Sequence, residues 1–572
     1  MHPQVISEFE TYLKTTTTMQ RTNTSTTPIR LAVVGGGLCG LTLGAALSRA
    51  QSAPSYVGTR IEVSIYEAAH TFKELGASVT LNSNALLALS ELNLLDHIIS
   101  HTGQTPRLST LFYTLGADTI PMNFGGKLPV TPEEAELHQV RNFTAERGEM
   151  TLHRARFMEA LMPLLDEGTT KVYFEKRCVD IGYLAAEDTY RVEFADGTRV
   201  EADMVVGADG VRSVVREVVG RGWGEGTGDA TAHSSTASSA SESPAAAFDG
   251  PRASTSRSNL EYTSHPDADP QLSYTGSKVY RALVPYEKLV QAGVKLDLQR
   301  LLVIVGLQHN IFTAPLANGT FINVAAYHND HALLCRPNPP ASRPWVRRGV
   351  SSEEMTDDFF GSSDEGGWSE DVRTLLRLAA EDANVWFMHD LNPGLESFVS
   401  VGRESDDGGS LKGLGRTGGR VVLIGDAAHA STPHLGAGIG QGIEDVHLLT
   451  SLLTHPLNLQ SPLPSLEAIL HTYSTTRLPR ANAVSRHSAA IGQLHGSFMS
   501  MEVKSMNRSM LGPGLMERKK AFRARLEEFE GVRRGVHEFD VRVEVEGAVR
   551  ALVRKGWFSN DSELESPSAT TT

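Results

Sequence analysis

The chain has 572 residues, of which 40% are hydrophobic and 21% are charged. A chain of this length accommodates two or three domains, or one large two-domain enzyme with insertions, and the composition is that of a soluble globular protein. The formal net charge of -14 argues against a nucleic-acid partner, because phosphate groups are bound by basic surfaces.

Cysteine content and hydropathy indicate in which cellular compartment the protein is expected. Three cysteines form no disulfide framework, which is typical of a reducing compartment. No stretch approaches the roughly 20 apolar residues of a membrane helix, and the N-terminus lacks the apolar core of a secretory signal. We therefore expect a cytoplasmic enzyme with no integral membrane segment, whose oligomeric state the composition leaves open.

The first elements in chain order predict a βαβ unit. Residues 1–28 are polar and Thr-rich, and we expect them to be a disordered tail. A buried strand at 31–34 then ends in glycines, a helix with small and apolar residues covers 41–50, and a second strand covers 61–66. This order is typical of the opening of a dinucleotide-binding domain.

The sequence GGGLCG at residues 35–40 joins the first strand to the helix. In the GxGxxG pattern, Gly35 permits the tight turn, Gly37 lets the backbone approach a pyrophosphate, and Gly40 allows helix and strand to pack closely. Glu67, at the end of the second strand, would accept hydrogen bonds from ribose hydroxyls and repel a 2′-phosphate, which favours FAD or NAD over NADP. The alternative interpretation is a glycine-rich turn beside a surface glutamate.

Two later strands also end in short glycine motifs. A strand at 203–206 leads into an Asp-Gly turn at Asp209, and a strand at 420–424 leads into GDAAH at 425–429. The glycine-rich loop 433–440 then opens an apolar-striped helix, whose N-terminus would stabilise negative charge on a bound cofactor. A plain glycine loop that caps a helix is the alternative, but it leaves the Gly-Asp strand end without a purpose.

The three motifs, in this order, resemble those of the group A flavoprotein monooxygenases, which are single-component FAD-dependent aromatic hydroxylases. The most similar branch is the salicylate hydroxylase type, with its fungal relatives that hydroxylate phenolic polyketides. The resemblance covers most of residues 30–550 outside the insertions. It implies bound FAD, with NADPH or NADH as a transient co-substrate. It also implies O2-dependent hydroxylation of a small aromatic substrate, with a phenol favoured, through a C4a-hydroperoxyflavin in secondary metabolism or aromatic catabolism.

The resemblance implies which residues contact FAD. Glu67 would bind the adenosine ribose and Asp426 the ribityl chain. Pro433 would lie near the reactive edge of the flavin, and Asp209 would support both FAD and NAD(P)H binding. An ordinary surface position is the alternative for Arg154. The full set of implied FAD contacts is Gly35, Gly37, Gly40, Glu67, Thr80, Arg154, Asp209, Asp426, Pro433, Gly436, Gly438 and Ile439.

Arg281 is the predicted substrate-binding, catalytic residue. It lies in YRALVP at 280–285, which resembles a family strand near the substrate pocket, where the matching arginine is thought to hold a phenolate oxygen. A guanidinium is a fixed cation suited to an oxyanion, although a structural strand arginine is the alternative.

Ala314 stands where the family commonly has a tyrosine. His309 and Tyr327 are possible replacements, and each is also typical of a packed core. The histidines show no metal-ligand spacing, so no metal site is predicted.

The predicted fold is α/β, with a Rossmann-type FAD-binding domain, a mostly antiparallel substrate-domain sheet and a helical C-terminal part. The low-complexity insertion is rich in Ser, Ala, Thr and Gly and buries too little apolar surface to offset the entropy of ordering. The predicted segments are 29–221 for the first part of the FAD-binding domain (with a substrate-side segment at about 82–140), 222–272 for the disordered insertion, 273–400 for the substrate-domain sheet, 401–455 for the second part of the FAD-binding domain, 456–558 for the helical region and 559–572 for a disordered tail.

Two other functions fit the same motifs. The scaffold supports epoxidation or oxidative decarboxylation, which product analysis would separate from hydroxylation. A flavin-binding protein without turnover would bind FAD but show no substrate-stimulated NAD(P)H oxidation. A plain NAD-dependent dehydrogenase is a poorer interpretation, because it leaves the Gly-Asp motif and its glycine loop without a purpose.

Overall fold

The computed structural model describes most of the chain between residues 27 and 558. The expected tails, 1–28 and 559–572, and the expected insertion, 222–272, lie outside the described residues except for positions 27, 28 and 272. The described residues are 27–56, 58–72, 78–107, 109–116, 119–121, 127–129, 136–142, 148–221, 272–306, 309–316, 319–329, 346–347, 350–360, 368–401, 418–456, 462–497 and 515–558.

A six-stranded sheet in the order β20-β21-β13-β1-β2-β9 forms the first layer. Its neighbouring strands are parallel except for the edge pair β20–β21. Because β13 lies between β21 and β1, the sheet is assembled from segments far apart in the sequence, which confirms the Rossmann-type prediction. The strands are β1 Ile29–Val34, β2 Ile61–Tyr66, β9 Thr170–Tyr173, β13 Met204–Gly207, β20 Val399–Val401 and β21 Gly418–Leu423.

Helices cover this sheet and continue through the C-terminal part of the chain. The helices of the first layer are α2 Leu38–Gln51, α3 Ser83–Glu91, α4 Leu95–Thr102, α6 Arg154–Leu161, the 3₁₀ turn η1 Met162–Leu164, α7 Val214–Arg221, α12 Asp426–His429, the 3₁₀ turn η3 Pro433–Leu435 and α13 Gly438–Leu453. The C-terminal helices are α14 Pro462–Ser497, α15 Leu515–His537 and α16 Val541–Arg554. Helix α2 begins earlier than predicted, so the last glycine of GGGLCG lies in its first turn.

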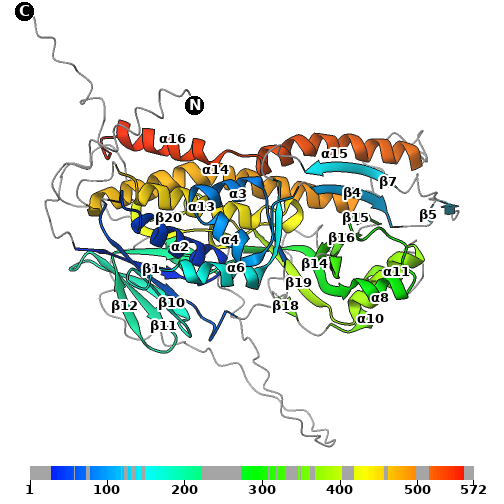
Figure 1. Cartoon of the computed structure of the whole chain (residues 1–572), viewed down its shortest axis with the longest axis horizontal. Coiled ribbons are helices and arrows are strands. Elements are labelled where there is room, and N and C mark those ends of the chain that lie inside the picture. The colour runs from blue at the N-terminus through cyan, green and yellow to red at the C-terminus, as the bar shows by residue number, and fades with distance from the viewer. Residues whose placement is uncertain are drawn as a thin grey trace, which may run out of the picture.

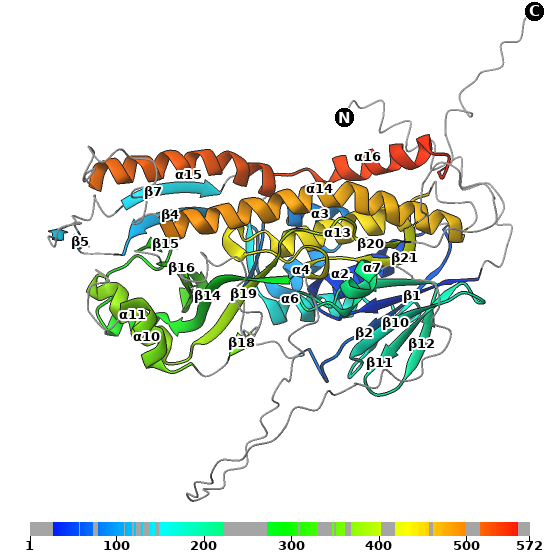
Figure 2. The same ribbon diagram turned by 180° about the vertical axis from the view of Figure 1, so that it is seen from behind.

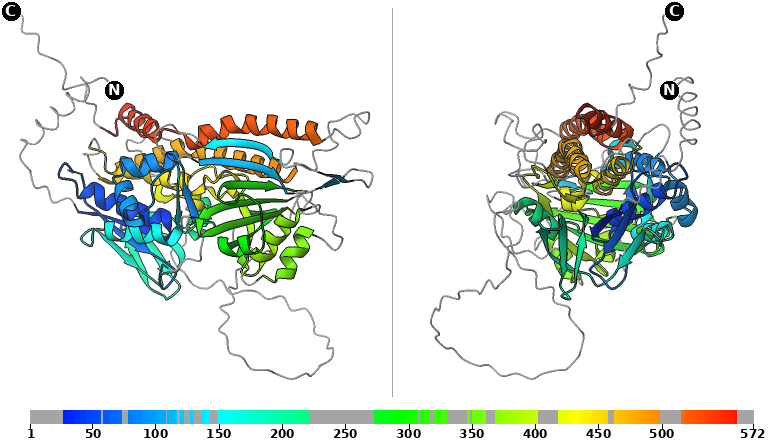
Figure 3. Two further views of the ribbon diagram at one scale, coloured as in Figure 1. Left: turned by 45° about the vertical axis from the view of Figure 1, so that its right-hand side comes forward. Right: turned by 90° about the vertical axis from the view of Figure 1, so that its left-hand side faces the viewer.

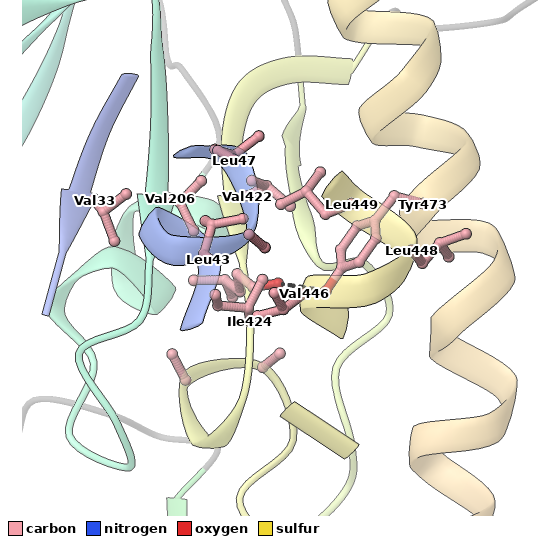
Figure 4. Packing of buried hydrophobic residues seen from close by; sticks show 14 of the residues in the cluster. Val33, Leu43, Leu47, Val206, Val422, Ile424, Val446, Leu448, Leu449 and Tyr473 are labelled. Carbon is pink, nitrogen blue, oxygen red and sulfur yellow. Dashed lines mark hydrogen bonds between the residues drawn. The ribbon is translucent and has the colours of Figure 1, made fainter. Parts of the chain in front are cut away.

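The core of the first layer packs α2 and α13 between the sheet and α14. Figure 4 shows Val206 of β13 gathered with Leu43 of α2 and Leu449 of α13. The Tyr473 hydroxyl of α14 donates a hydrogen bond of 3.0 Å to the Leu423 carbonyl at the end of β21. The predicted apolar residues of α13 are all buried. The polar side of α13 is buried as well, because α14 and α16 cover it.

An eight-stranded sheet in the order β18-β19-β14-β17-β16-β15-β4-β7 forms the second part of the molecule. It is antiparallel apart from the parallel pair β15–β4. Strands β4 and β7 come from the N-terminal half of the chain and close one edge. The strands are β4 Ser109–Leu115, β7 Glu136–Asn142, β14 Leu272–Pro285, β15 Leu301–Val305, β16 His309–Leu316, β17 Phe321–Asn329, β18 Val346–Arg347 and β19 Asn384–Leu391.

Three helices cover one face of the eight-stranded sheet (Figure 1), namely α8 Tyr286–Gln291, α10 Ser352–Phe360 and α11 Glu370–Ala380. Trp368 packs within this layer over Gly116 and Gly306, where an added Cβ would lie 2.2 Å from the indole ring at either glycine. The opposite face of the sheet looks toward α14 and α15 (Figure 3). Alternate residues of each strand therefore belong to different layers.

The long C-terminal helices join the two sheets. Helix α14 reaches from β21 of the first sheet to β16 of the second, and α15 and α16 lie end to end along the same side of the molecule (Figure 2). This arrangement confirms the predicted helical C-terminal part. None of the helices in the described ranges combines the length and hydrophobicity needed to span a bilayer. The remaining strands, in smaller sheets, are β3 Ser78–Leu81, β8 Met150–His153, β5 Thr119–Pro121, β6 Lys127–Pro129, β10 Cys178–Leu184, β11 Thr189–Phe194 and β12 Arg199–Ala202.

Candidate cofactor and substrate site

The first glycine motif forms a tight turn between β1 and α2. Gly35 has φ of +105°, and a Cβ there would lie 2.4 Å from the Ala208 carbonyl oxygen. A Cβ at Gly40 would lie 2.0 Å from the Gly35 carbonyl oxygen, so the helix approaches the turn as closely as glycine permits. At Gly37 the nearest atom to an added Cβ is Nη2 of Arg154, 3.8 Å away. The turn thus leaves room in front of Gly37 for a pyrophosphate, with a guanidinium beside it.

The Glu67 side chain is hydrogen-bonded to the backbone of this turn. Its carboxylate accepts hydrogen bonds from the backbone N–H groups of Gly36, at 2.9 Å, and Ala69, at 2.8 Å. The side chain is therefore held at the end of β2 beside the glycine motif, where the ribose of a bound dinucleotide is expected.

Asp209 anchors the start of α7. Its carboxylate accepts hydrogen bonds from the Ser213 hydroxyl and from the backbone N–H groups of Val214 and Val215. Burial raises the pKa of Asp209 to about 6, although these hydrogen bonds favour the ionised form. Sequence reasoning missed this capping role, although an Asp-Gly turn shortly before an apolar helix is itself a helix-start signal.

Arg216 is a buried residue that sequence reasoning also missed. Its guanidinium donates to the carbonyl oxygens of Ala427, at 2.9 Å, and Asp426, at 3.4 Å. It links α7, which follows the second motif, to α12 in the third. The local sequence holds no signal for this contact, because an arginine on a short helix is ordinarily exposed.

The first and third motifs meet at the thiol of Cys39. A Cβ at Gly425, which has φ of +62°, would lie 2.7 Å from the sulfur, and one at Gly442 would lie 2.4 Å from it. Burial raises the pKa of Cys39, and the nearby Asp426 carboxylate adds to the effect. Asp426 itself is exposed, and its Oδ1 lies 4.0 Å from the Cβ position of Gly438, the first residue of α13. The Gly-Asp turn and the α13 N-terminus therefore face one space.

The loop before α13 is shaped by its own turn. Pro433 begins η3, and Gly436, with φ of +61°, ends it. The Gly436 carbonyl accepts a hydrogen bond of 3.0 Å from the side-chain amide of Asn82, which follows β3 and was not singled out from the sequence. Ile439 is partly buried against the main core. Thr80 of β3 lies within 3.0 Å of the Thr151 hydroxyl on β8, the strand that leads into Arg154.

Arg281 lies in the middle of the eight-stranded sheet. Its backbone pairs with Ala325 of β17 and Asn384 of β19, and its side chain is partly buried. Within the described part of the chain, its guanidinium has no hydrogen bond or ion pair. Tyr327 is two residues beyond Ala325 and therefore on the same face. Burial raises the pKa of Tyr327, and the nearby Arg281 opposes this shift.

Tyr327 also contacts the loop before α13. The centres of its ring and of the His434 ring are 5.1 Å apart. Burial lowers the pKa of His434 to about 4, so its imidazole is neutral at physiological pH. Arg281 and Tyr327 therefore lie on the sheet face that contacts the loop of the third motif.

The two suggested replacements for a tyrosine at Ala314 lie on opposite faces of the sheet. Ala314 pairs with Asn323, in register with the Arg281 face. His309 lies on the helix-covered face, where its ring centre is 4.8 Å from that of Phe359. The structure therefore removes His309 from this role and leaves Tyr327 on the correct face.

Known proteins match this arrangement. A family model described as an FAD binding domain matches residues 29–290 and 416–488, which is more than half of the chain. A salicylate hydroxylase of Pseudomonas putida is 30% identical over 498 residues, with 86% of this chain and 91% of that protein covered. A 6-methylsalicylate 1-monooxygenase of Aspergillus terreus is 28% identical over 458 residues, with 80% of each protein covered.

Solved structures share the fold. A salicylate hydroxylase in a substrate complex superimposes with a TM-score of 0.60 at 23% identity, covering 91% of this chain and 98% of that one. HpxO of Klebsiella pneumoniae, complexed with FAD and uric acid, gives a TM-score of 0.52 at 17% identity, covering 92% and 97%. The glycine turn with its room for a pyrophosphate, the Gly-Asp turn and the facing helix N-terminus fit FAD as cofactor. The chain therefore belongs to the FAD-binding domain family, as an FAD-dependent monooxygenase related to salicylate hydroxylase.

Proposed function

We propose that the chain hydroxylates a small aromatic molecule that carries an acidic oxygen, such as a phenol or a hydroxylated benzoate, with NAD(P)H and O2 as co-substrates. The observation that carries this proposal is Arg281, a cation without an anionic partner among the described residues, on the sheet face that also bears Tyr327. A guanidinium in a partly buried site is stabilised by an oxyanion, which a phenolate or carboxylate supplies. The salicylate hydroxylase relatives support an aromatic substrate of this kind.

The cofactor would be held by residues from all three motifs. Gly35, Gly37 and Gly40, together with the α2 N-terminus, would bind the pyrophosphate, and Glu67 the ribose. Asp426 would bind the ribityl chain. The remaining expected contacts are Thr80, Arg154, Asp209, Pro433, Gly436, Gly438 and Ile439. When bound, FAD supplies the electron transfer from NAD(P)H and the activation of O2.

The protein would bind, orient and shield the substrate. Arg281 would hold the substrate oxyanion, and the Tyr327 hydroxyl, whose pKa burial raises, would donate a second hydrogen bond. The neutral His434 ring supports Tyr327 from the loop side without placing a second cation beside Arg281. Apolar neighbours on the same face, Val279, Ala325 and Met388, would exclude water from the reacting ring.

A substitution series at Arg281 tests the proposal. Wild-type protein should be yellow, oxidise NADH or NADPH faster when salicylate or a substituted phenol is added, and give a product heavier by one oxygen. Arg281→Met should retain FAD, while kcat/KM falls roughly 10- to 100-fold, because a hydrogen bond to a charged group contributes about 1.5–3 kcal/mol. Arg281→Lys should recover part of this loss for the anionic ring. Unchanged kinetics in Arg281→Met would remove this residue from the site.

The same assay separates the alternatives. Release of CO2 with the product would identify oxidative decarboxylation, and an oxirane product would identify epoxidation. A yellow protein with no stimulation across a broad panel of phenols would favour a flavin-binding protein without turnover. We also propose a cytoplasmic location, supported by the free thiols of Cys39 and Cys178.

A further inference from the structure

A cluster of buried charges lies between α13, α14 and α16, beside the Gly-Asp turn. Three of its side chains, those of Glu444, Asp445 and Arg477, are 0% exposed. Arg480 and Glu544 lie at the edge of the cluster, with 13% and 10% of their side chains exposed. Ions so far from water are tolerated only when each is paired and hydrogen-bonded, so this cluster is a strongly constrained part of the fold. None of these residues was assigned a role from the sequence.

One carboxylate of the cluster holds the Gly-Asp turn. Asp445 Oδ2 accepts a hydrogen bond of 2.8 Å from the Gly425 N–H and lies 2.6 Å from Nε2 of His429. Its Oδ1 accepts a hydrogen bond of 2.8 Å from Nε of Arg477. Gly425 has a positive φ and directly precedes Asp426, so the hydrogen bond from Gly425 fixes the direction in which Asp426 leaves the strand.

The other side of Arg477 is held by the C-terminal helix. Its Nη1 donates to Glu444, at 2.7 Å, and to both carboxylate oxygens of Glu544 on α16, at 3.0 and 2.9 Å. Hydrogen bonds thus run without interruption from Glu544 through Arg477 and Asp445 to Gly425. The four residues belong to α16, α14, α13 and the turn after β21.

A second arginine fixes the approach of α16. Arg480 donates to Glu444 and, at 2.9 Å, to the Val536 carbonyl near the end of α15. Its guanidinium lies 3.7 Å from the ring centre of Phe539, in the link between α15 and α16. The contacts of Arg480 with Val536 and Phe539 therefore fix the approach of α16, which carries Glu544.

We infer that Glu544 and Asp445 are positioning residues for the cofactor turn Gly425–Asp426, which makes the C-terminal helix α16 a determinant of FAD affinity. This inference rests on the proposed binding of the ribityl chain by Asp426. Neither residue needs to touch FAD. Glu544 orients Arg477, Arg477 orients Asp445, and Asp445 holds the backbone of the turn.

Glu544→Gln and Asp445→Asn test the inference, with Glu546→Gln as the matched control. Glu546 is on the same helix, but it is 65% exposed and its nearest cation is Arg550 at 3.7 Å. The measurement is the dissociation constant of FAD, and separately of ADP, for the flavin-free full-length protein. ADP contains the adenosine and pyrophosphate of FAD but has no ribityl chain, so it probes the GGGLCG end of the site without reaching Asp426.

We expect Glu544→Gln to weaken FAD binding roughly tenfold, and Asp445→Asn to weaken it more, as the loss of charged hydrogen bonds predicts. ADP binding should stay within about twofold of wild type in both variants, and Glu546→Gln should match wild type for both ligands. Glu544→Gln carries the test alone if Asp445→Asn yields no folded protein, because its side chain lies at the edge of the cluster.

Three results would overturn the inference. Equal FAD affinity in Glu544→Gln and wild type would show that α16 does not act on the turn. Equal weakening of FAD and ADP would show a general loss of structure instead of positioning. Wild-type protein that binds ADP but not FAD would refute the proposed role of Asp426 itself, which distinguishes failure of the proposed function from failure of this inference.

Discussion

Gly40→Ala tests the packing that brings the α2 N-terminus to the glycine turn. The new methyl carbon would lie 2.0 Å from the Gly35 carbonyl oxygen and 3.3 Å from Cγ1 of Val33. Non-bonded carbon and oxygen atoms stay about 3.3 Å apart or more, so the helix would have to withdraw by roughly 1 Å. Overpacking typically costs about 1–3 kcal/mol, and we expect about 3 kcal/mol here because the obstacle is backbone and not a flexible side chain.

The assay is urea unfolding of the flavin-free protein, followed by FAD titration. The withdrawn helix would move its N–H groups away from the pyrophosphate, so FAD affinity should fall at least about tenfold, or about 1.4 kcal/mol. Gly531→Ala is the control, because it lies within α15 and, apart from the backbone of its own helix, no atom of the described residues lies within 4 Å of the added methyl group. It should stabilise the protein by up to about 1 kcal/mol through helix propensity. Wild-type stability and FAD affinity in Gly40→Ala would refute the packing argument.

Three further predictions concern other parts of the site and fold. Asp426→Ala should fold normally but be purified without flavin, because the exposed Asp426 side chain is proposed to bind FAD and does not pack in the core. A fully yellow variant would contradict the proposed role of Asp426 in FAD binding. Folding raises the pKa of Asp209 from 3.8 to about 6, so protonated Asp209 stabilises the folded state below about pH 4, and this stabilisation is lost as the pH rises through about 6. Asp209→Asn should remove this pH dependence of the free energy of unfolding, measured by urea unfolding of the flavin-free protein between about pH 4 and 6. Trp368→Ala should lower the free energy of unfolding by about 3–5 kcal/mol, because the indole fills the space over Gly116 and Gly306; a loss below about 1 kcal/mol would show that the two glycines close the gap.

Features encoded in a few consecutive residues could be predicted from the sequence. The strand, glycine turn and helix at GGGLCG form one local unit, in which Gly35 and Gly40 have distinct steric reasons to be glycine. The Gly-Asp end of β21 is equally local. These signals, with the order of the motifs, were enough to predict the family and the α/β fold, both of which are confirmed. The FAD and substrate contacts of individual residues remain predictions.

Which of His309 and Tyr327 can take the place of the tyrosine that is absent at Ala314 could be decided only from the strand pairing in the sheet. Both residues lie on strands next to each other, and both are aromatic and capable of hydrogen bonding. The face that each side chain occupies depends on register with β14, which a single strand sequence does not contain. Only the paired strands show that Tyr327 shares the face of Arg281.

The sequence by itself determined the cofactor fingerprint and the alternation of elements, because glycine sterics and backbone periodicity act over a few residues. The charge cluster at Glu444, Asp445, Arg477 and Glu544 was decided only by the tertiary structure. For each of these residues, the local sequence indicates an ordinary solvent-exposed charge on a helix. Packing of α13, α14 and α16 removes the water around them, and the energetic cost of that burial forces the carboxylates and guanidinium groups to pair across a hundred residues of chain.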